Sequence, residues 1–542
     1  MNERMAGRRW AGLVFISIAV SLIIVDSTIV NVAVPSIVED LGISSTEVQW
    51  VQEAYTLVFA SLLLVFGSLA DRFGRRRLML LGVAIFVLAS IAAAVAPSGG
   101  LLILARLVQG IGGSMILPTT LSLINATFRG RERGIAFAVW GSTIGGMAAV
   151  GPLLGGWLTT AFSWRWAFGI NIPLGILIVI GVLFTVAESR SDRREGIDGV
   201  GALLSVLTMA PLVFGLIEGR TYGWWTVDQP LQIGDWQWPW TLSPVPIAFA
   251  VALVALVAFV AWGVHRQRIG RSTLLALGLF RITSFRNGNI AAAVVSLGEF
   301  GIILALPLWL QFVVGFDALQ TGLLLLSLAI GSFVASGIAG ALSGRVAPVW
   351  IVRAGLLAEI IGVAGVAFTI GPDATWGPLI PFLFVYGVGV GLATAQLTGV
   401  VLAEVPPAES GAASGTQSTS RQLGAALGVA ILGTVLFSTT SSVLTSALDD
   451  RGLPAEQRDQ VVSQVVDSAG AAIVGLEQSP QTQDLASDAK AAFSDGTRAA
   501  AFTAAGFLTL GLVSTLTLGA AASGRRTREE TEAEEAATSG DR

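Results

Sequence analysis

Apolar segments about 20 residues long, the length that spans the hydrocarbon core of a bilayer as an α-helix, recur along the chain from Leu13 to Ala520. Of the 542 residues, 53% are hydrophobic and only 13% are charged, about half the charged share of an ordinary soluble domain. The sequence therefore predicts an all-α polytopic membrane protein.

Charges and turn residues divide the apolar sequence into separate spans. We predict fourteen of them, at roughly 11–35, 47–70, 78–97, 101–125, 135–159, 166–187, 200–218, 245–264, 286–310, 321–342, 350–370, 378–402, 412–438 and 499–522. An even number of spans places both termini on the same side of the membrane. The first span contains the polar residues Asp26 and Asn31 and has no clear small-residue cleavage site. We therefore expect it to remain in the mature protein and not to be removed as a signal peptide.

Arginine is concentrated in alternate loops, and basic residues mark the cytoplasmic side of a membrane protein. The predicted inside loops carry Arg72, Arg75, Arg76 and Arg77; Arg129, Arg131 and Arg133; Arg190, Arg193 and Arg194; and Arg266, Arg268, Arg271, Arg281 and Arg286. This asymmetry predicts a multi-pass protein of a bacterial inner membrane with both termini in the cytoplasm.

A partial repeat suggests two related halves. Gly67–Arg76, between the second and third spans, is echoed in a degraded form without the aspartate at Gly340–Pro348. We therefore predict two six-helix bundles with two extra helices between them. The predicted regions are 1–10, a cytoplasmic N-terminus; 11–187, the first bundle; 188–264, a linker with the extra helices; 265–285, a cytoplasmic loop; 286–522, the second bundle, with an extracytoplasmic loop at 440–496; and 523–542, an acidic cytoplasmic tail.

Several motifs, spread over nearly the whole chain, resemble those of the major facilitator superfamily, and within it the fourteen-span drug:proton antiporter family. They are Asp26–Pro35, Gly67–Arg77, Arg106–Gly110, Gly145–Gly156, Trp164–Gly175 and Gly411–Gly424. The resemblance implies a major facilitator fold and a proton-coupled exporter of the multidrug-efflux, antibiotic-resistance type. The substrate would be an amphipathic, cationic small molecule.

Two glycine-bearing segments are candidates for conformational gating. The first holds Gly67, Asp71, Arg72, Gly74 and Arg75; the second holds Gly145, Gly151, Pro152, Gly155 and Gly156. Glycine lets helices approach closely, and proline kinks them. The resemblance implies a cytoplasmic latch for the first segment and an exporter signature for the second. The alternatives are arginines that only fix the topology, and ordinary helix packing.

Ionisable residues inside spans are costly to insert and are functional candidates by default. The predicted proton-coupling and cation-binding set is Asp26, Glu53, Arg106, Glu299 and Glu359. An apolar environment favours the neutral form of a carboxyl group, as a proton carrier requires. We expect Asp26 and Glu299 to be the leading acceptors and Arg106 to modulate them. The alternative is that Arg106 forms a purely structural ion pair.

Aromatic and amide side chains could line a cavity for flat cations through stacking and cation–π contacts. The predicted set is Asn31, Trp50, Tyr55, Phe300, Trp309, Gln311, Tyr386 and Gln396. The alternative is that these aromatic residues pack the helices or anchor them at the interface.

Other functions lack support in the sequence. The chain has no cysteine and one histidine, so we expect no metal site, and it has no phosphate-binding glycine loop, so we expect no direct use of ATP. We predict no enzyme activity, no cofactor, no nucleic-acid partner and a monomeric protein. Export of an endogenous lipid or cell-envelope metabolite remains an alternative, as does a non-transporting receptor with a transporter-like fold.

Overall fold

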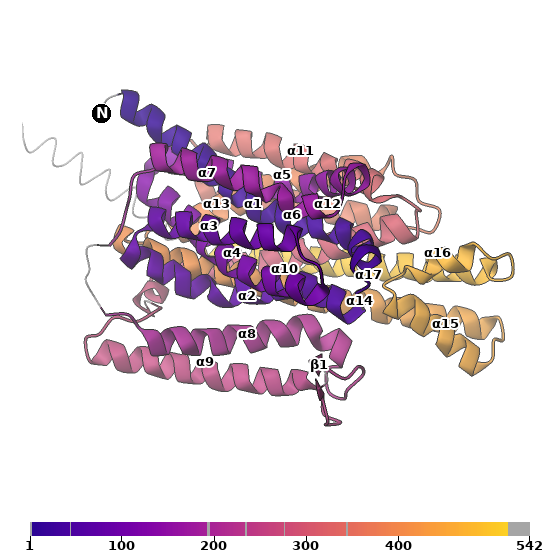
Figure 1. Cartoon of the computed structure of the whole chain (residues 1–542). Helices are drawn as coiled ribbons and strands as arrows, with labels where there is room; N and C mark the ends of the chain where they lie inside the picture. The colour runs from indigo at the N-terminus through magenta and orange to yellow at the C-terminus, as the bar shows by residue number, and fades with distance from the viewer. Residues whose placement is uncertain are drawn as a thin grey trace, which may run out of the picture.

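The computed structural model describes residues 3–43, 45–191, 196–233, 236–275, 277–342 and 345–518, and these form a long bundle of helices (Figure 1). At one end of the bundle lie the N-terminus and the arginine-rich loops, which we call the arginine end. At the other end lie a small β-hairpin and two short helices, which we call the hairpin end. The predicted all-α membrane architecture is confirmed, and the predicted tail at 523–542 lies outside the described residues.

The first half of the chain supplies seven helices. They are α1 (Glu3–Leu41), α2 (Ser45–Phe73), α3 (Arg75–Ala94), α4 (Gly99–Thr127), α5 (Gly130–Ala161), α6 (Arg165–Gly169) and α7 (Asn171–Thr185). Helix α1 packs against α5 and α7, and α4 packs against α2 and α3. The short α6 leads directly into α7, and together they correspond to one predicted span.

Two extra helices follow, α8 (Gly199–Tyr222) and α9 (Pro244–Arg268), joined by a two-stranded antiparallel hairpin of β1 (Gln232–Ile233) and β2 (Trp236–Gln237). The two helices pack side by side along one flank of the bundle (Figure 1), where α8 contacts α2 and α14. In the connection between these two helices, Trp225 is exposed, whereas Trp224 stacks on Phe249 of α9.

The second half begins with a 3₁₀ segment and contains the remaining helices. They are η1 (Leu277–Arg281), α10 (Thr283–Phe312), α11 (Ala318–Leu342), α12 (Pro348–Thr369), α13 (Leu379–Val401), η2 (Pro407–Glu409), α14 (Ser410–Asp450), α15 (Ala455–Asp467), α16 (Ala472–Glu477), α17 (Gln483–Ser514) and η3 (Thr515–Leu518). Most of the predicted loop 440–496 is helical. Helices α14 and α17 continue past the predicted span ends, and α15 and α16 project beyond the bundle at the hairpin end (Figure 1).

Thirteen stretches of the described chain are long and apolar enough to cross a membrane. The remaining predicted span, at 135–159, corresponds to α5, a helix of 32 residues. Helix α5 packs against α1 in its own half and against α11 in the other half. Each of the fourteen predicted spans therefore coincides with a helix.

The two halves meet chiefly along two pairs of helices, α5 with α11 and α2 with α14, and α13 also contacts α5 while α14 contacts α4. At the arginine end the contact between α2 and α14 is very close. A Cβ atom added to Gly67 of α2 would lie 2.6 Å from both the Gly411 carbonyl oxygen and the Gly415 Cα of α14. Only glycine permits the two backbones to approach this closely.

A buried carboxylate holds the extra helices together. Asp198 accepts hydrogen bonds from the Gly201 amide at the start of α8 (2.9 Å), from the Trp262 indole of α9 (2.8 Å) and from the Leu274 amide (3.1 Å). Its Oδ2 also lies 3.7 Å from Nε of Arg266. The side chain thus caps one helix and anchors the other.

Replacing Asp198 with alanine should destabilise the extra pair, because three buried donors and one arginine lose their acceptor. We expect a loss of about 2 kcal/mol or more, seen as a lower midpoint of thermal unfolding in detergent. The exposed Asp373, replaced in the same way, is the matched control. Equal midpoints for the two variants would contradict this assignment.

Candidate functional site

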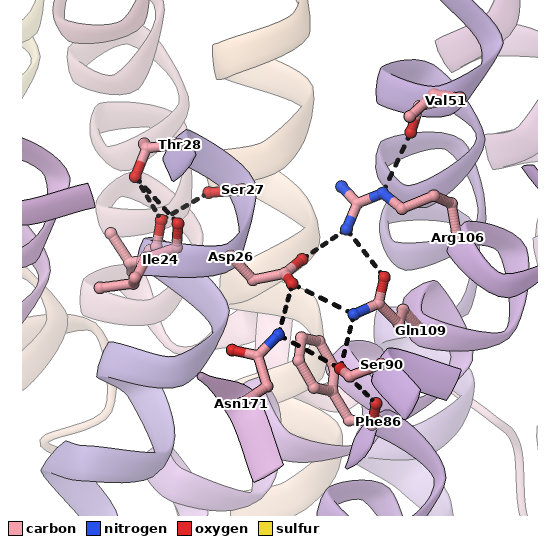
Figure 2. A network of polar contacts seen from close by, with 11 residues as sticks. Ile24, Asp26, Ser27, Thr28, Val51, Phe86, Ser90, Arg106, Gln109 and Asn171 are labelled. Atoms are coloured by element: carbon pink, nitrogen blue, oxygen red, sulfur yellow. Dashed lines mark hydrogen bonds and ion pairs between the residues drawn. The ribbon is translucent and has the colours of Figure 1, made fainter. Parts of the chain in front are cut away.

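A fully buried acid–base network occupies the core of the first half (Figure 2). The Arg106 guanidinium of α4 donates to Oδ2 of Asp26 in α1 at 2.5 Å. Asn171 at the start of α7 and Gln109 of α4 donate to Oδ1 of the same carboxylate at 2.7 and 3.1 Å. Both amides also donate to the hydroxyl of Ser90 in α3, at 3.2 and 2.8 Å.

The positive partner in this network is equally well held. Arg106 donates through Nε to the Val51 carbonyl of α2 at 3.0 Å and through Nη1 to Gln109 at 2.9 Å. Its guanidinium carbon lies 4.5 Å from the centroid of the Tyr55 ring, a cation–π contact. Five helices therefore converge on one ion pair. Removing either partner would leave an uncompensated buried charge, which is strongly destabilising.

A second cluster lies in the other half. Glu299 of α10 is almost fully buried and lies 3.6 Å from Arg421 of α14, measured from Oε2 to Nη2. Thr394 of α13 donates to the other carboxylate oxygen at 3.0 Å. The Tyr386 hydroxyl, also on α13, donates to the Glu299 backbone carbonyl at 3.4 Å.

Glu359 of α12 gives this second cluster a different charge balance. Its side chain is 0% exposed, and neither carboxylate oxygen has a hydrogen-bond partner among the described residues. The charged groups that interact with it are Glu299 and Arg421. An ionised carboxylate without a direct partner in an apolar interior costs several kcal/mol or more. If both Glu299 and Glu359 were ionised, Arg421 could neutralise one of them and the other would be an unpaired charge. A proton on one of the two acids removes that charge.

The fifth ionisable candidate, Glu53, lies apart from both clusters. It is near the hairpin end of α2, where its carboxyl group is hydrogen-bonded to that of Glu218 in α8. Of the five candidates the structure therefore brings Asp26 together with Arg106 and Glu299 together with Glu359, and it separates these two clusters into different halves.

The glycine-bearing loop at the arginine end joins the two halves. Asp71, at the end of α2, accepts from the backbone amides of Gly411 and Ala412 at 2.8 and 2.9 Å, and so caps the N-terminus of α14. Arg75 pairs with Asp71 at 2.6 Å and donates to the Pro407 carbonyl at 2.6 Å.

Two other contacts between the halves lie close to this cap. Asn125 donates to the Ser410 hydroxyl at 2.8 Å, and Arg133 donates to the Ala403 carbonyl at 3.4 Å. The arginine end is therefore closed in this conformation.

Gly74 and Arg72 of the same loop have different surroundings. Gly74 has a φ of 106°, a left-handed conformation that suits glycine, and it links α2 to α3. A Cβ atom there would meet the Glu188 carboxylate, which accepts from the amides of Arg76 and Arg77 at 3.1 Å and caps α3. Arg72 is exposed.

Two of the predicted glycines of α5, Gly151 and Gly155, face α1. Added Cβ atoms at Gly151 and Gly155 would collide with Thr28 and with the Ile29 backbone, so both positions require glycine for this packing. Gly156 is half-buried in the same helix. The side-chain surroundings of Gly145 and Pro152 lie outside the described residues.

The predicted cavity residues do not form one lining. Tyr55 packs on Phe59 and Phe86 within the first half. Trp309 is fully buried and donates to Ser494 of α17 at 3.1 Å.

Trp50, by contrast, stacks on Phe214 of α8 and so faces the extra helices. Tyr386 adjoins Glu299, and Gln396 is buried with its amide nitrogen unpartnered among the described residues. Phe300 and Gln311 are half-buried, and the side chain of Asn31 lies outside the described residues.

Sequence reasoning missed several members of these clusters. Arg421 and Glu218 are charges inside or at the end of predicted spans, so the rule that singled out Glu299 applies to them as well. Gln109 follows Arg106 by three residues and shares its helix face. Ser90, Asn171 and Thr394 are uncharged polar residues of a kind common in membrane helices, and only the fold shows that they meet the acids.

Curated relatives of the chain are bacterial export and resistance proteins. It is 34% identical to the "Probable actinorhodin transporter" of Streptomyces coelicolor over 82% of this chain and 75% of that protein. It is 35% identical to "Puromycin resistance protein pur8" of Streptomyces alboniger, over 81% and 84%. It is 33% identical to "Multidrug efflux pump LfrA" of Mycolicibacterium smegmatis, over 91% and 93%.

Solved structures share the fold at low identity. The human organic anion transporter MFSD10 superposes with a TM-score of 0.58 at 14% identity, covering 95% of this chain and 100% of that one. The proton:xylose symporter XylE gives 0.54 at 13%, covering 87% and 96%. The family model described as Major Facilitator Superfamily matches residues 16–429. Together with the paired halves and their buried charges, this match shows a multi-pass membrane transporter and not an enzyme: the chain belongs to the major facilitator superfamily.

Proposed function

We propose that this protein is a proton-coupled antiporter that exports amphipathic, cationic small molecules across a bacterial inner membrane. Both termini lie in the cytoplasm, because the arginine end is the more basic one, and the protein acts as a monomer. The names of the relatives, a puromycin resistance protein and a multidrug efflux pump among them, support a drug-like substrate.

One observation supports the proton coupling: the cluster in the second half combines two buried acids, Glu299 and Glu359, with one arginine, Arg421. The spare negative charge can be balanced by a proton or by a cationic substrate, but not by both at once. Binding of one therefore displaces the other, which is the simplest basis for exchange. Tyr386 and Thr394 hold Glu299 in position for this competition.

The first half has a different role in this scheme. The charge of Asp26 is neutralised by Arg106, and both of its carboxylate oxygens accept hydrogen bonds from Arg106, Gln109 or Asn171. In this conformation neither oxygen is available to a proton or a cation. Asp26 can accept a proton only when Arg106 moves away from it. We assign the pair to a step of the cycle in which the helices that carry these residues rearrange.

The contacts at the arginine end define the state of the cycle. With Asp71 capping α14 and Gly67 against Gly411, the transporter is closed toward the proposed cytoplasmic side. Opening to that side would break the cap and the Arg75–Pro407 bond together. Alternating access would then be a rocking of the halves about the long α5–α11 contact.

The direct test is efflux of a fluorescent organic cation from proteoliposomes with an imposed pH gradient. Flux that follows the gradient supports the proposal, and flux indifferent to it contradicts proton coupling. No flux for a broad panel of cations would favour export of an endogenous lipid or a receptor function.

Replacing Glu359 with glutamine should reduce gradient-driven efflux to the leak rate of protein-free vesicles. The amide is neutral like the protonated acid but cannot release a proton, so substrate binding to purified protein should lose its pH dependence. The exposed Glu456, changed to glutamine, is the control. Wild-type efflux by the Glu359→Gln protein would remove this residue from the coupling.

Replacing Asp26 with asparagine should abolish coupled efflux and also lower stability, by about 3–5 kcal/mol, because Arg106 is left as an unpaired buried charge. The double variant Asp26→Asn/Arg106→Gln removes both charges and should recover much of the thermal stability. Efflux should stay absent in the double variant. If efflux returns together with stability, the pair is only structural.

Replacing Gly67 with alanine should open the arginine end, because the added methyl would meet backbone atoms of α14 at 2.6 Å. The chain has no cysteine, so cysteines introduced at Phe73 and Ala403 would be the sole attachment points for spin labels. The distance between the two labels can then be measured by pulsed electron paramagnetic resonance. The distance distribution should shift to longer values.

Gly337→Ala is the matched control for this variant, since a Cβ atom at that helical glycine meets nothing within 4 Å. Identical distance distributions for the Gly67 and Gly337 variants would contradict the latch.

A further inference from the structure

Helix α8 of the extra pair carries a buried acid that neither cluster uses. Glu218 is 2% exposed and lies against α2, where its carboxyl group is hydrogen-bonded to that of Glu53. Two carboxyl groups, one from the transport core and one from the extra helices, thus meet directly near the hairpin end.

Among the described residues around this pair, no cation is available as a counterion. Arg220, two residues after Glu218, is engaged elsewhere. Its guanidinium carbon lies 3.7 Å from the centroid of the Phe437 ring of α14, and its charge interacts with that of Asp467. Arg106 is engaged by Asp26 and the Val51 carbonyl. Among the described side chains, no ion pair includes Glu53 or Glu218.

Aromatic rings enclose the rest of the site. Trp50 of α2 stacks on Phe214 of α8 with ring centroids 6.5 Å apart, and Phe214 stacks on Tyr222 at 6.1 Å. The phenol of Tyr222 is the other titratable group that interacts with both acids. The pair therefore lies in an aromatic interface between α2 and α8, in which Glu218 is buried and Glu53 is half-buried.

The hydrogen bond between the two acids requires a proton. An ionised carboxylate only accepts hydrogen bonds, so one of the two groups must be protonated to donate. Two ionised carboxylates in contact, without a cation, repel each other strongly in an apolar site. In agreement with this, Oε2 of each acid is buried and receives no hydrogen bond from any described donor.

We propose that Glu53 and Glu218 form a proton-binding site that fastens the extra helix α8 to helix α2 of the transport core. With one shared proton the two helices are joined by a hydrogen bond. When the proton leaves, two negative charges face each other and the contact is lost. Helix α2 also carries Gly67 and Asp71 at its other end, so this site connects the extra pair to a helix that closes the arginine end.

A pH series of thermal unfolding in detergent tests the proposal without any transport measurement, so its failure is separable from failure of the proposed antiport. As the pH rises from mildly acidic to alkaline, the wild-type midpoint should fall when the shared proton is lost. In Glu218→Gln and in Glu53→Gln the amide donates to the remaining carboxylate, so this part of the fall should vanish. The exposed Glu39, changed to glutamine, should behave like the wild type.

Infrared spectroscopy of the same proteins gives a second, independent reading. The shared proton predicts one carboxylic-acid C=O band that is lost in either single glutamine variant and kept in Glu218→Asp. The Glu359→Gln variant should leave that band in place. The proposal is overturned if Glu218→Gln keeps both the band and the wild-type pH dependence, or if the two single variants remove different bands.

Discussion

The membrane interior tolerates a charged group only when another group neutralises it, and this constraint decides how the transporter is arranged. We propose that the protein meets this constraint in three ways. Asp26 and Arg106 neutralise each other inside the first half. Glu299 shares Arg421 with Glu359, which leaves one negative charge for a proton or a cation. Glu53 and Glu218 have no arginine at all and need a proton to remain in contact. The three sites thus differ in how strongly they depend on protons.

We propose that helix packing converts changes in these local charge states into movements of whole helices. The acids lie on α1, α2, α8, α10 and α12, and each of these helices is packed tightly against neighbours. Glycines such as Gly67 and Gly155 bring helix backbones into contact, so a helix can shift only together with its partner. Asp71 also caps α14 by accepting hydrogen bonds from the Gly411 and Ala412 amides. These two short bonds form or break together when α2 and α14 separate. A change of charge in one cluster can therefore favour one of two discrete arrangements.

Much of this organisation could be predicted from the sequence, because span length and arginine distribution are strong, local signals. The candidates Asp26, Arg106, Glu299 and Glu359 were identifiable as charges inside spans. Their grouping was not, since the contacts join residues far apart in the chain, such as Arg421 with Glu299. The cavity residues stay a prediction, because an aromatic residue such as Trp309 serves packing as readily as binding and the sequence alone does not separate the two roles. The lengths of α14 and α17 were underestimated because polar residues continue both helices beyond the bundle.

The central claim is that proton and cation compete for one spare negative charge in the second half. Proton release on substrate binding measures this directly, using purified protein in weakly buffered detergent solution with a pH indicator. Saturation with an organic cation should release protons in a fixed proportion to the bound cation, and titration with a neutral analogue should release none. Binding of the cation without any release of protons, over the pH range in which transport occurs, would contradict the account.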